Sequence, residues 1–147
     1  MRFIASVIDK LQRHPKRIVF PEGTEPRVLM AARQFHSLRL GVPILLGDRG
    51  RVKALAESLN VPLEGIRIID PERSDDLPAY VARYERLRRL KGIDEREARE
   101  TIIKPNFFGA MMVAMHGADG FVSGTGEATG SVLRPLFQII KVAPRAT

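Results

Sequence analysis

The sequence predicts an α/β fold in which a parallel sheet carries helices on both faces. Short runs rich in Val and Ile alternate with longer segments whose apolar residues recur at helical spacing, which is typical of βαβ units. The apolar residues of these runs are consecutive and do not alternate with polar residues, which indicates strands buried on both faces. The connections between the predicted elements are short, as parallel α/β units require.

The first half of the chain is predicted to read strand, helix, strand, helix, strand. Strands are expected at 16–20, 42–46 and 67–69, and each ends at a turn signal: Pro21-Glu22-Gly23, Gly47-Asp48 and Asp70-Pro71. Helices are expected from an N-cap at Thr24 to about residue 38, and over 49–59. A short amphipathic helix is expected before them, with apolar residues at positions 3, 4, 7, 8 and 11.

The second half is predicted to be mostly helical. One helix covers 77–90 and stops at Gly92, a second runs from its cap at Asp94 to about 102, and a third covers 105–116. The methionines of the third helix are interpreted as core residues rather than a binding surface. A strand at 121–122 and a last helix through 133–140 complete the pattern. Because that helix leads to no further strand, we expect the chain to be a segment of a longer protein.

Composition narrows the possible functions. The net charge is +7, but no interleaving of basic and aromatic residues indicates a single-strand nucleic-acid surface, so we expect no nucleic-acid partner. The chain lacks cysteine, which suits the cytoplasm, and it has no apolar run long enough for a membrane span. The three histidines are too scattered for metal binding, so we expect no metal site.

The segment 120–135, GFVSGTGEATGSVLRP, is the clearest candidate for ligand binding. Glycines leave backbone N–H groups accessible, and the unpaired amides at a helix N-terminus favour an anion such as phosphate. Hydroxyl groups and one guanidinium could add donors: Ser123, Thr125, Thr129, Ser131 and Arg134. The segment matches neither a Walker A loop nor GxGxxG. The alternative interpretation is an ordinary loop with an N-cap hydroxyl.

A basic helix segment, YERLRRLKG at 84–92, is the second candidate. Arg88 and Lys91 share a helix face there, and the alternative interpretation is a solvated basic surface. The chain shows no triad-like motif such as GxSxG, so a complete catalytic set is not expected in it.

Six segments in register resemble the phosphate acetyl/butyryl transferase family. They are RIVFPEG at 17–23, PILLGD at 43–48, IIDPE at 68–72, YERLRRLKG at 84–92, PNFFGAMMV at 105–113 and GADGFVSG…T…LRP at 117–135. The resemblance implies residues 1–147 as the amino-terminal α/β segment of a phosphate acyltransferase domain, similar to one lobe of the isocitrate/isopropylmalate dehydrogenase-like fold. It implies a cytoplasmic, homodimeric enzyme of acetate metabolism that interconverts acetyl-CoA plus phosphate with acetyl phosphate plus coenzyme A. Coenzyme A is then a substrate, and no metal or other cofactor is expected.

The resemblance also implies the binding residues. The family's Ser-Gly falls on Ser123 and Gly124, its loop threonine on Thr129, and its Leu-Arg-Pro places an arginine at Arg134. The arginine of its Leu-Arg-x-x-Lys-Gly segment falls on Arg88. The family's catalytic serine, arginine and aspartate lie in a carboxy-terminal half beyond Thr147, so the segment alone is expected to be inactive.

Two departures keep a different function open. Where the family commonly reads Ser-Gly-Ala-x-His-Ser-Thr, this chain has Glu127 and Ala128, which add a negative charge and remove a hydroxyl. The alternative is therefore a regulatory domain that senses acetyl-CoA, like the domain at the carboxy terminus of large malic enzymes. A nucleic-acid binder is the third alternative, and it predicts steeply salt-dependent affinity.

Overall fold

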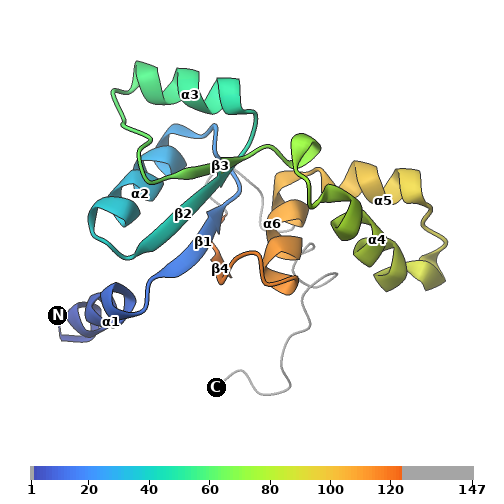
Figure 1. Cartoon of the computed structure of the whole chain (residues 1–147), viewed down its shortest axis with the longest axis horizontal. Coiled ribbons are helices and arrows are strands. Elements are labelled where there is room, and N and C mark those ends of the chain that lie inside the picture. Colours follow the sequence, from blue (N-terminus) through green and yellow to red (C-terminus); the bar gives the residue numbers. More distant parts are fainter. Residues whose placement is uncertain (1, 124–147) are drawn as a thin grey trace.

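A parallel sheet forms the centre of the molecule. The computed structural model describes residues 2–123, and within them the sheet has four strands in the order β3-β2-β1-β4 (Figure 1). The strands are β1 (Lys16–Phe20), β2 (Gly41–Leu46), β3 (Arg67–Ile69) and β4 (Gly120–Phe121). All three neighbouring pairs are parallel. The predicted α/β class and parallel sheet are confirmed.

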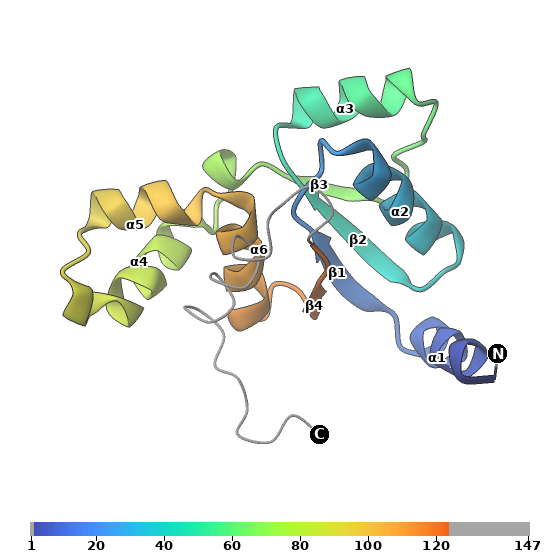
Figure 2. The same ribbon diagram turned by 180° about the vertical axis from the view of Figure 1, so that it is seen from behind.

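The helices flank this sheet on both sides. Their bounds are α1 (Arg2–Arg13), α2 (Pro26–Ser37), α3 (Arg49–Ser58), α4 (Leu77–Leu87), α5 (Glu95–Ile102) and α6 (Pro105–Ala114), with 3₁₀ turns η1 (Pro71–Arg73) and η2 (Arg89–Lys91). Both ribbon views place α1 at the end of the molecule opposite to α4 and α5 (Figures 1 and 2). The helix predicted through 133–140 lies outside the described residues.

Side chains that alternate along β1 and β2 build two separate cores. Val19 and Ile44 point into a cluster with α4, α5 and α6, whereas Phe20 and Leu45 point into a cluster with α2 and α3. Fully burying one such side chain stabilises the fold by about 1.5–3 kcal/mol. The prediction that helices cover both faces is therefore confirmed.

Most predicted helix ends are close to those observed. Asp94 caps α5, and its Oδ1 accepts a hydrogen bond from the backbone N–H of Glu97 at 2.9 Å. Gly92 ends η2 with φ 70°, a left-handed conformation that favours glycine. The predicted cap at Thr24 is wrong by one residue, because Glu25 precedes the helix-starting Pro26 and its carboxylate accepts the N–H of Arg27.

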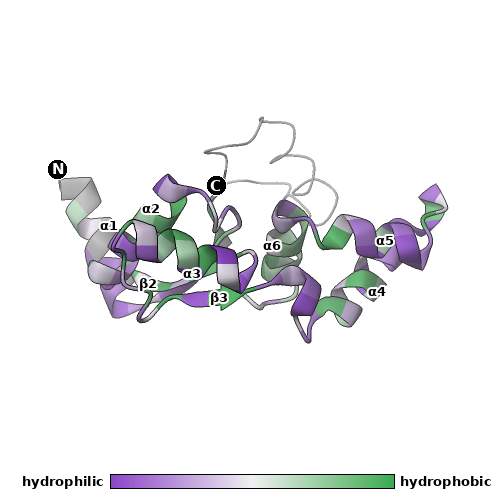
Figure 3. Cartoon of the chain, turned by 90° about the horizontal axis from the view of Figure 1, so that it is seen from above, coloured by the Kyte–Doolittle hydropathy of each residue, from purple (hydrophilic) through white to green (hydrophobic). Residues whose placement is uncertain are grey.

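The α5 helix is hydrophilic over most of its surface, as the hydropathy colouring shows (Figure 3). Only Ala98 and Ile102 of this helix are buried, and both belong to the cluster around α4 and α6. In α6, by contrast, Met111 and Met112 are 0% and 3% exposed. The interpretation of the methionine stripe as core is confirmed for Met111 and Met112 but is wrong for Met115, which follows the end of α6 and is 38% exposed.

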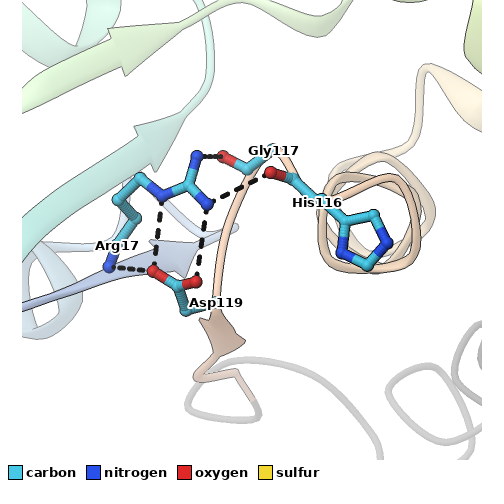
Figure 4. Close-up of polar contacts among 4 residues, drawn as sticks. All are labelled: Arg17, His116, Gly117 and Asp119. Atoms are coloured by element: carbon cyan, nitrogen blue, oxygen red, sulfur yellow. Dashed lines mark hydrogen bonds and ion pairs between the residues drawn. The ribbon is translucent and has the colours of Figure 1, made fainter.

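An arginine–aspartate contact joins the start of β4 to β1 (Figure 4). The backbone N–H of Arg17 donates to Oδ2 of Asp119 at 2.8 Å, and its guanidinium donates to both carboxylate oxygens at 3.3 and 3.4 Å. The same guanidinium donates to the carbonyl oxygens of Gly117 and His116 at 3.3 and 3.1 Å. These bonds fix the turn between α6 and β4, and so they set the position at which the chain leaves β4.

A close approach of α6 to the sheet depends on Gly109. A Cβ atom at this position would lie 2.9 Å from Cε2 of Phe121 and 3.1 Å from Cγ1 of Val19. Glycine therefore allows α6 to pack directly over β1 and β4. This packing brings the amino end of α6 beside the carboxyl ends of these strands.

Candidate functional site

The candidate site lies where the parallel strands end. In the strand order β3-β2-β1-β4, the chain winds outward from β1 to β3 and then crosses back to place β4 on the other side of β1. The direction of winding thus reverses between β1 and β4. In open α/β sheets, ligands bind in the crevice outside the carboxyl ends of the strands at such a switch point.

A crevice of about 720 Å³ occupies this edge of the sheet. Its walls are the loops after β1, β2 and β3 and the first turn of α6, which contributes Lys104, Pro105, Asn106 and Phe107. This volume is within the range of small-molecule sites, about 300–1,000 Å³. The crevice can therefore hold a metabolite of moderate size or one part of a larger ligand.

The lining of the crevice is more acidic than the chain as a whole. The acidic residues of the lining are Glu22, Glu25, Asp48, Asp70 and Glu72, and its basic residues are Arg51 and Lys104. Three of the carboxylates cap helices or turns: Glu25 for α2, Asp48 for α3 and Asp70 for η1. These positive helix ends are thus already satisfied by the chain's own side chains.

The amino end of α6 differs from those three. It begins after Lys104, and no side chain caps it. The helix dipole adds partial positive charge at this end of α6, where Lys104, Pro105 and Asn106 line the crevice.

Ser123, a predicted binding residue, follows β4 by two positions and lies at the switch point. Its Oγ is 3.1 Å from Oε1 of Glu22, in the loop after β1, and 2.9 Å from Oδ1 of Asn106, in the first turn of α6. Asn106 is only 8% exposed. The structure thus gathers side chains from three elements around one hydroxyl group.

Sequence reasoning did not assign a role to Glu22 or Asn106. Both lie within segments that carried the family resemblance, PEG and PNFFG. Their positions in the sequence could have indicated a role at the site. Glu22 directly follows a buried strand and its turn proline, and Asn106 lies at the start of an apolar helix. Neither position reveals the contact with Ser123, which is 101 residues from Glu22 along the chain.

Arg88, the second predicted binding residue in the described part, lies at the end of α4. Its Nε is buried and has no hydrogen-bond partner among residues 2–123. Burial raises the pKa of Tyr84, and the charge and hydrogen bond of Arg88 partly offset this rise. Tyr84 packs edge-on against Phe107, with ring centroids 6.0 Å apart, and Phe107 lines the crevice. Arg88 is thus linked to the crevice through two aromatic rings.

The other predicted binding residues, Gly124, Thr129 and Arg134, lie outside the described residues, as do Glu127 and Ala128. Ser123 and Arg88 share no hydrogen bond in the part of the chain that the structure describes. Among residues 2–123, no three acidic or histidine side chains come together in a way that could hold a metal ion. None of the helices in this range has both the length and the apolar character of a bilayer-spanning segment.

Fold and crevice together define an open, doubly wound α/β protein with a candidate ligand site at the carboxyl edge of its sheet. The chain belongs to the phosphate acetyl/butaryl transferase family, whose model matches residues 2–147. It is 42% identical over 146 residues to a phosphate acetyltransferase of Thermoanaerobacterium thermosaccharolyticum, covering 99% of this chain and 44% of that protein. It is 40% identical over 136 residues to a phosphate acetyltransferase of Staphylococcus aureus, covering 92% of this chain and 41% of that protein.

Solved structures give the same result. The EutD phosphotransacetylase from Staphylococcus aureus matches with a TM-score of 0.88 and 38% identity, covering 97% of this chain and 43% of that one. A phosphotransacetylase from Streptococcus pyogenes matches with a TM-score of 0.86 and 33% identity, covering 96% and 44%. The chain thus spans less than half the length of these relatives.

Proposed function

We propose that the protein containing this chain is a phosphate acetyltransferase, which converts acetyl-CoA and phosphate into acetyl phosphate and coenzyme A. The observation that carries the proposal is the family match over residues 2–147, together with relatives named phosphate acetyltransferase. The chain supplies the amino-terminal α/β part of the domain. Because the relatives are more than twice as long, further residues beyond this chain complete the site in the proposed enzyme.

In this proposal the crevice at the switch point forms one wall of the substrate site. A second lobe, as in the isocitrate/isopropylmalate dehydrogenase-like fold, forms the opposite wall. The remaining parts of the proposal are a cytoplasmic homodimer, with coenzyme A as a substrate and no other cofactor.

The described residues have distinct tasks in acyl transfer. The reaction passes through an anionic intermediate, which preorganised hydrogen-bond donors stabilise. Arg88 supports this role because its buried Nε–H has no partner among the described residues, and a buried donor of this kind is satisfied by a bound anion. The uncapped start of α6 adds a partial positive charge at the crevice. In the proposal, Gly124, Thr129 and Arg134 complete the anion site.

The experiment is an assay of acetyl-CoA formation from acetyl phosphate and coenzyme A, made with the full-length protein. Wild-type protein should turn over, and Arg88→Ala should lower kcat/KM about 10- to 100-fold, as expected for a lost hydrogen bond to a charged group. Arg83→Ala is the matched control, because Arg83 lies on the same helix and is exposed. The 147-residue chain alone should bind substrate without turnover. A full-length protein that lacks turnover would refute the proposal.

The sequence of the segment after β4 favours a second candidate, a domain that senses acetyl-CoA. Glu127 and Ala128 replace residues that are neutral or carry a hydroxyl in the family's common pattern, and the added carboxylate opposes the binding of inorganic phosphate there. Calorimetry distinguishes the two functions. Competition between phosphate and acetyl-CoA supports the transferase, whereas acetyl-CoA binding that is independent of phosphate supports the sensor.

A further inference from the structure

The hydroxyl group of Ser123 lies between two acceptor atoms. Its Oγ is 3.1 Å from Oε1 of Glu22 and 2.9 Å from Oδ1 of Asn106. A hydroxyl group carries one proton and can donate only one hydrogen bond at a time, although its oxygen can accept further bonds. One of the two neighbours must therefore donate to Ser123.

The chemistry of the two neighbouring side chains determines which of them donates a hydrogen bond to Ser123. An ionised carboxylate can only accept hydrogen bonds, so the Ser123 hydroxyl donates its hydrogen bond to Glu22. The amide of Asn106 can exchange its oxygen and nitrogen by a half-turn, which places Nδ2 toward Ser123. The bonds then run in one direction, from Nδ2 of Asn106 to Oγ of Ser123 and from Oγ to Oε1 of Glu22.

We propose that Glu22 is a positioning residue that accepts the hydrogen bond donated by the Ser123 hydroxyl, so that Ser123 offers a ligand an acceptor and no donor. Phosphate and acyl phosphate oxygens need donors, and Ser123 cannot provide one while its bond to Glu22 holds. Coenzyme A carries such donors on its arm, the amide N–H groups and the thiol S–H. Ser123 therefore contacts the arm of coenzyme A and not the phosphate, an inference that rests on the proposed function.

The surroundings of Ser123 agree with this assignment. Glu22 lines the crevice, and its negative charge next to Ser123 opposes a phosphate at the same point. Asn106 is buried and lies in the first turn of α6, so its side chain has little freedom to release Ser123. In this assignment the phosphate is bound by the arginine side chains and backbone N–H groups of the anion site proposed above.

The test measures the KM for coenzyme A and the KM for acetyl phosphate separately in the full-length protein. Ser123→Ala should raise the KM for coenzyme A about three- to tenfold, as for one lost hydrogen bond, and change the KM for acetyl phosphate less than about twofold. Glu22→Ala should behave in the same way. Combining it with Ser123→Ala should add little, since the two residues act as a unit.

Conservative and remote variants provide the controls. Glu22→Gln keeps an acceptor oxygen for the Ser123 hydroxyl, so its KM for coenzyme A should rise less than that of Glu22→Ala. Ser58→Ala should be silent, because the Ser58 hydroxyl donates to the carbonyl of Leu55 at the exposed end of α3. A Ser123→Ala variant that raises the KM for acetyl phosphate and not for coenzyme A would overturn the assignment, while wild-type turnover would leave the proposed function standing.

Calorimetry with coenzyme A and this chain gives the same comparison without turnover. Ser123→Ala should weaken coenzyme A binding about three- to tenfold, as for one lost hydrogen bond. An unchanged affinity would overturn the inference, whether or not the full-length protein proves to be a phosphate acetyltransferase.

Discussion

Replacing Gly109 with alanine should destabilise the fold, although alanine is the better helix former. The substitution favours α6 by about 0.5–1 kcal/mol through backbone entropy. The added Cβ would lie 2.9 and 3.0 Å from two ring carbons of Phe121 and 3.1 Å from Cγ1 of Val19. Overpacking of this kind costs about 1–3 kcal/mol, because the neighbours must leave their preferred positions. The clash therefore outweighs the gain, and the net loss is about 1 kcal/mol.

Thermal unfolding followed by circular dichroism measures this loss, with an expected fall in Tm of about 3–6 °C. Gly50→Ala is the matched control, since Gly50 lies in α3 and, among the described residues, the only atom near its added Cβ is the capping Oδ1 of Asp48, at 3.2 Å. The Tm of this control should be unchanged or higher. If Gly109→Ala were as stable as wild type, α6 would not pack as closely on β1 and β4 as described.

Three further predictions test other parts of the structure. Hydrogen bonds from the backbone and side chain of Arg17 lower the pKa of Asp119 below 3.8. The stabilisation from these bonds is therefore complete above pH 3.8 and is lost as the pH falls through the lowered pKa. The gap in urea midpoint between wild type and Asp119→Asn should close at low pH, and a constant gap would contradict this reasoning. Arg88→Ala should raise the pKa of Tyr84 further in an ultraviolet titration, since Arg88 now lowers it; a fall would place the guanidinium elsewhere. Phe108→Ala should cost about 3–5 kcal/mol in urea unfolding, because Phe108 is 1% exposed and packs on Tyr80; a loss under about 1 kcal/mol would contradict its core position.

The strands and most helices could be predicted because their signals are local. The run KRIVF ends in apolar and β-branched residues before Pro21, and the parallel pairing of β1 with β2 follows from the βαβ unit that joins them. The cap of α5 was equally predictable, since Asp94 precedes a segment of strong helix formers. The cap of α2 was misplaced because Thr24 and Glu25 both precede Pro26, and only the fold shows which side chain accepts the N–H of Arg27.

The candidate site could be predicted only in part, because its contacts are not local. Ser123 was identified from its glycine-rich surroundings, but its partners come from positions 101 and 17 residues away. No periodicity or spacing encodes such a meeting, which depends on β4 lying beside β1 and on α6 packing through Gly109. The burial of Nε of Arg88 could not be predicted either, because the basic segment around it was equally consistent with a solvated helix face.

One titration tests the central claim most directly, that the crevice at the carboxyl ends of the strands is the substrate site. Coenzyme A and acetyl phosphate are added separately to the ¹⁵N-labelled chain, and backbone amide shifts are recorded by NMR. Shifts should concentrate on the residues after β1 and β4 and at the start of α6, around Glu22, Asn106 and Ser123. Shifts confined to the opposite edge of the sheet, around Arg33, Arg39 and Gly41, would contradict the account.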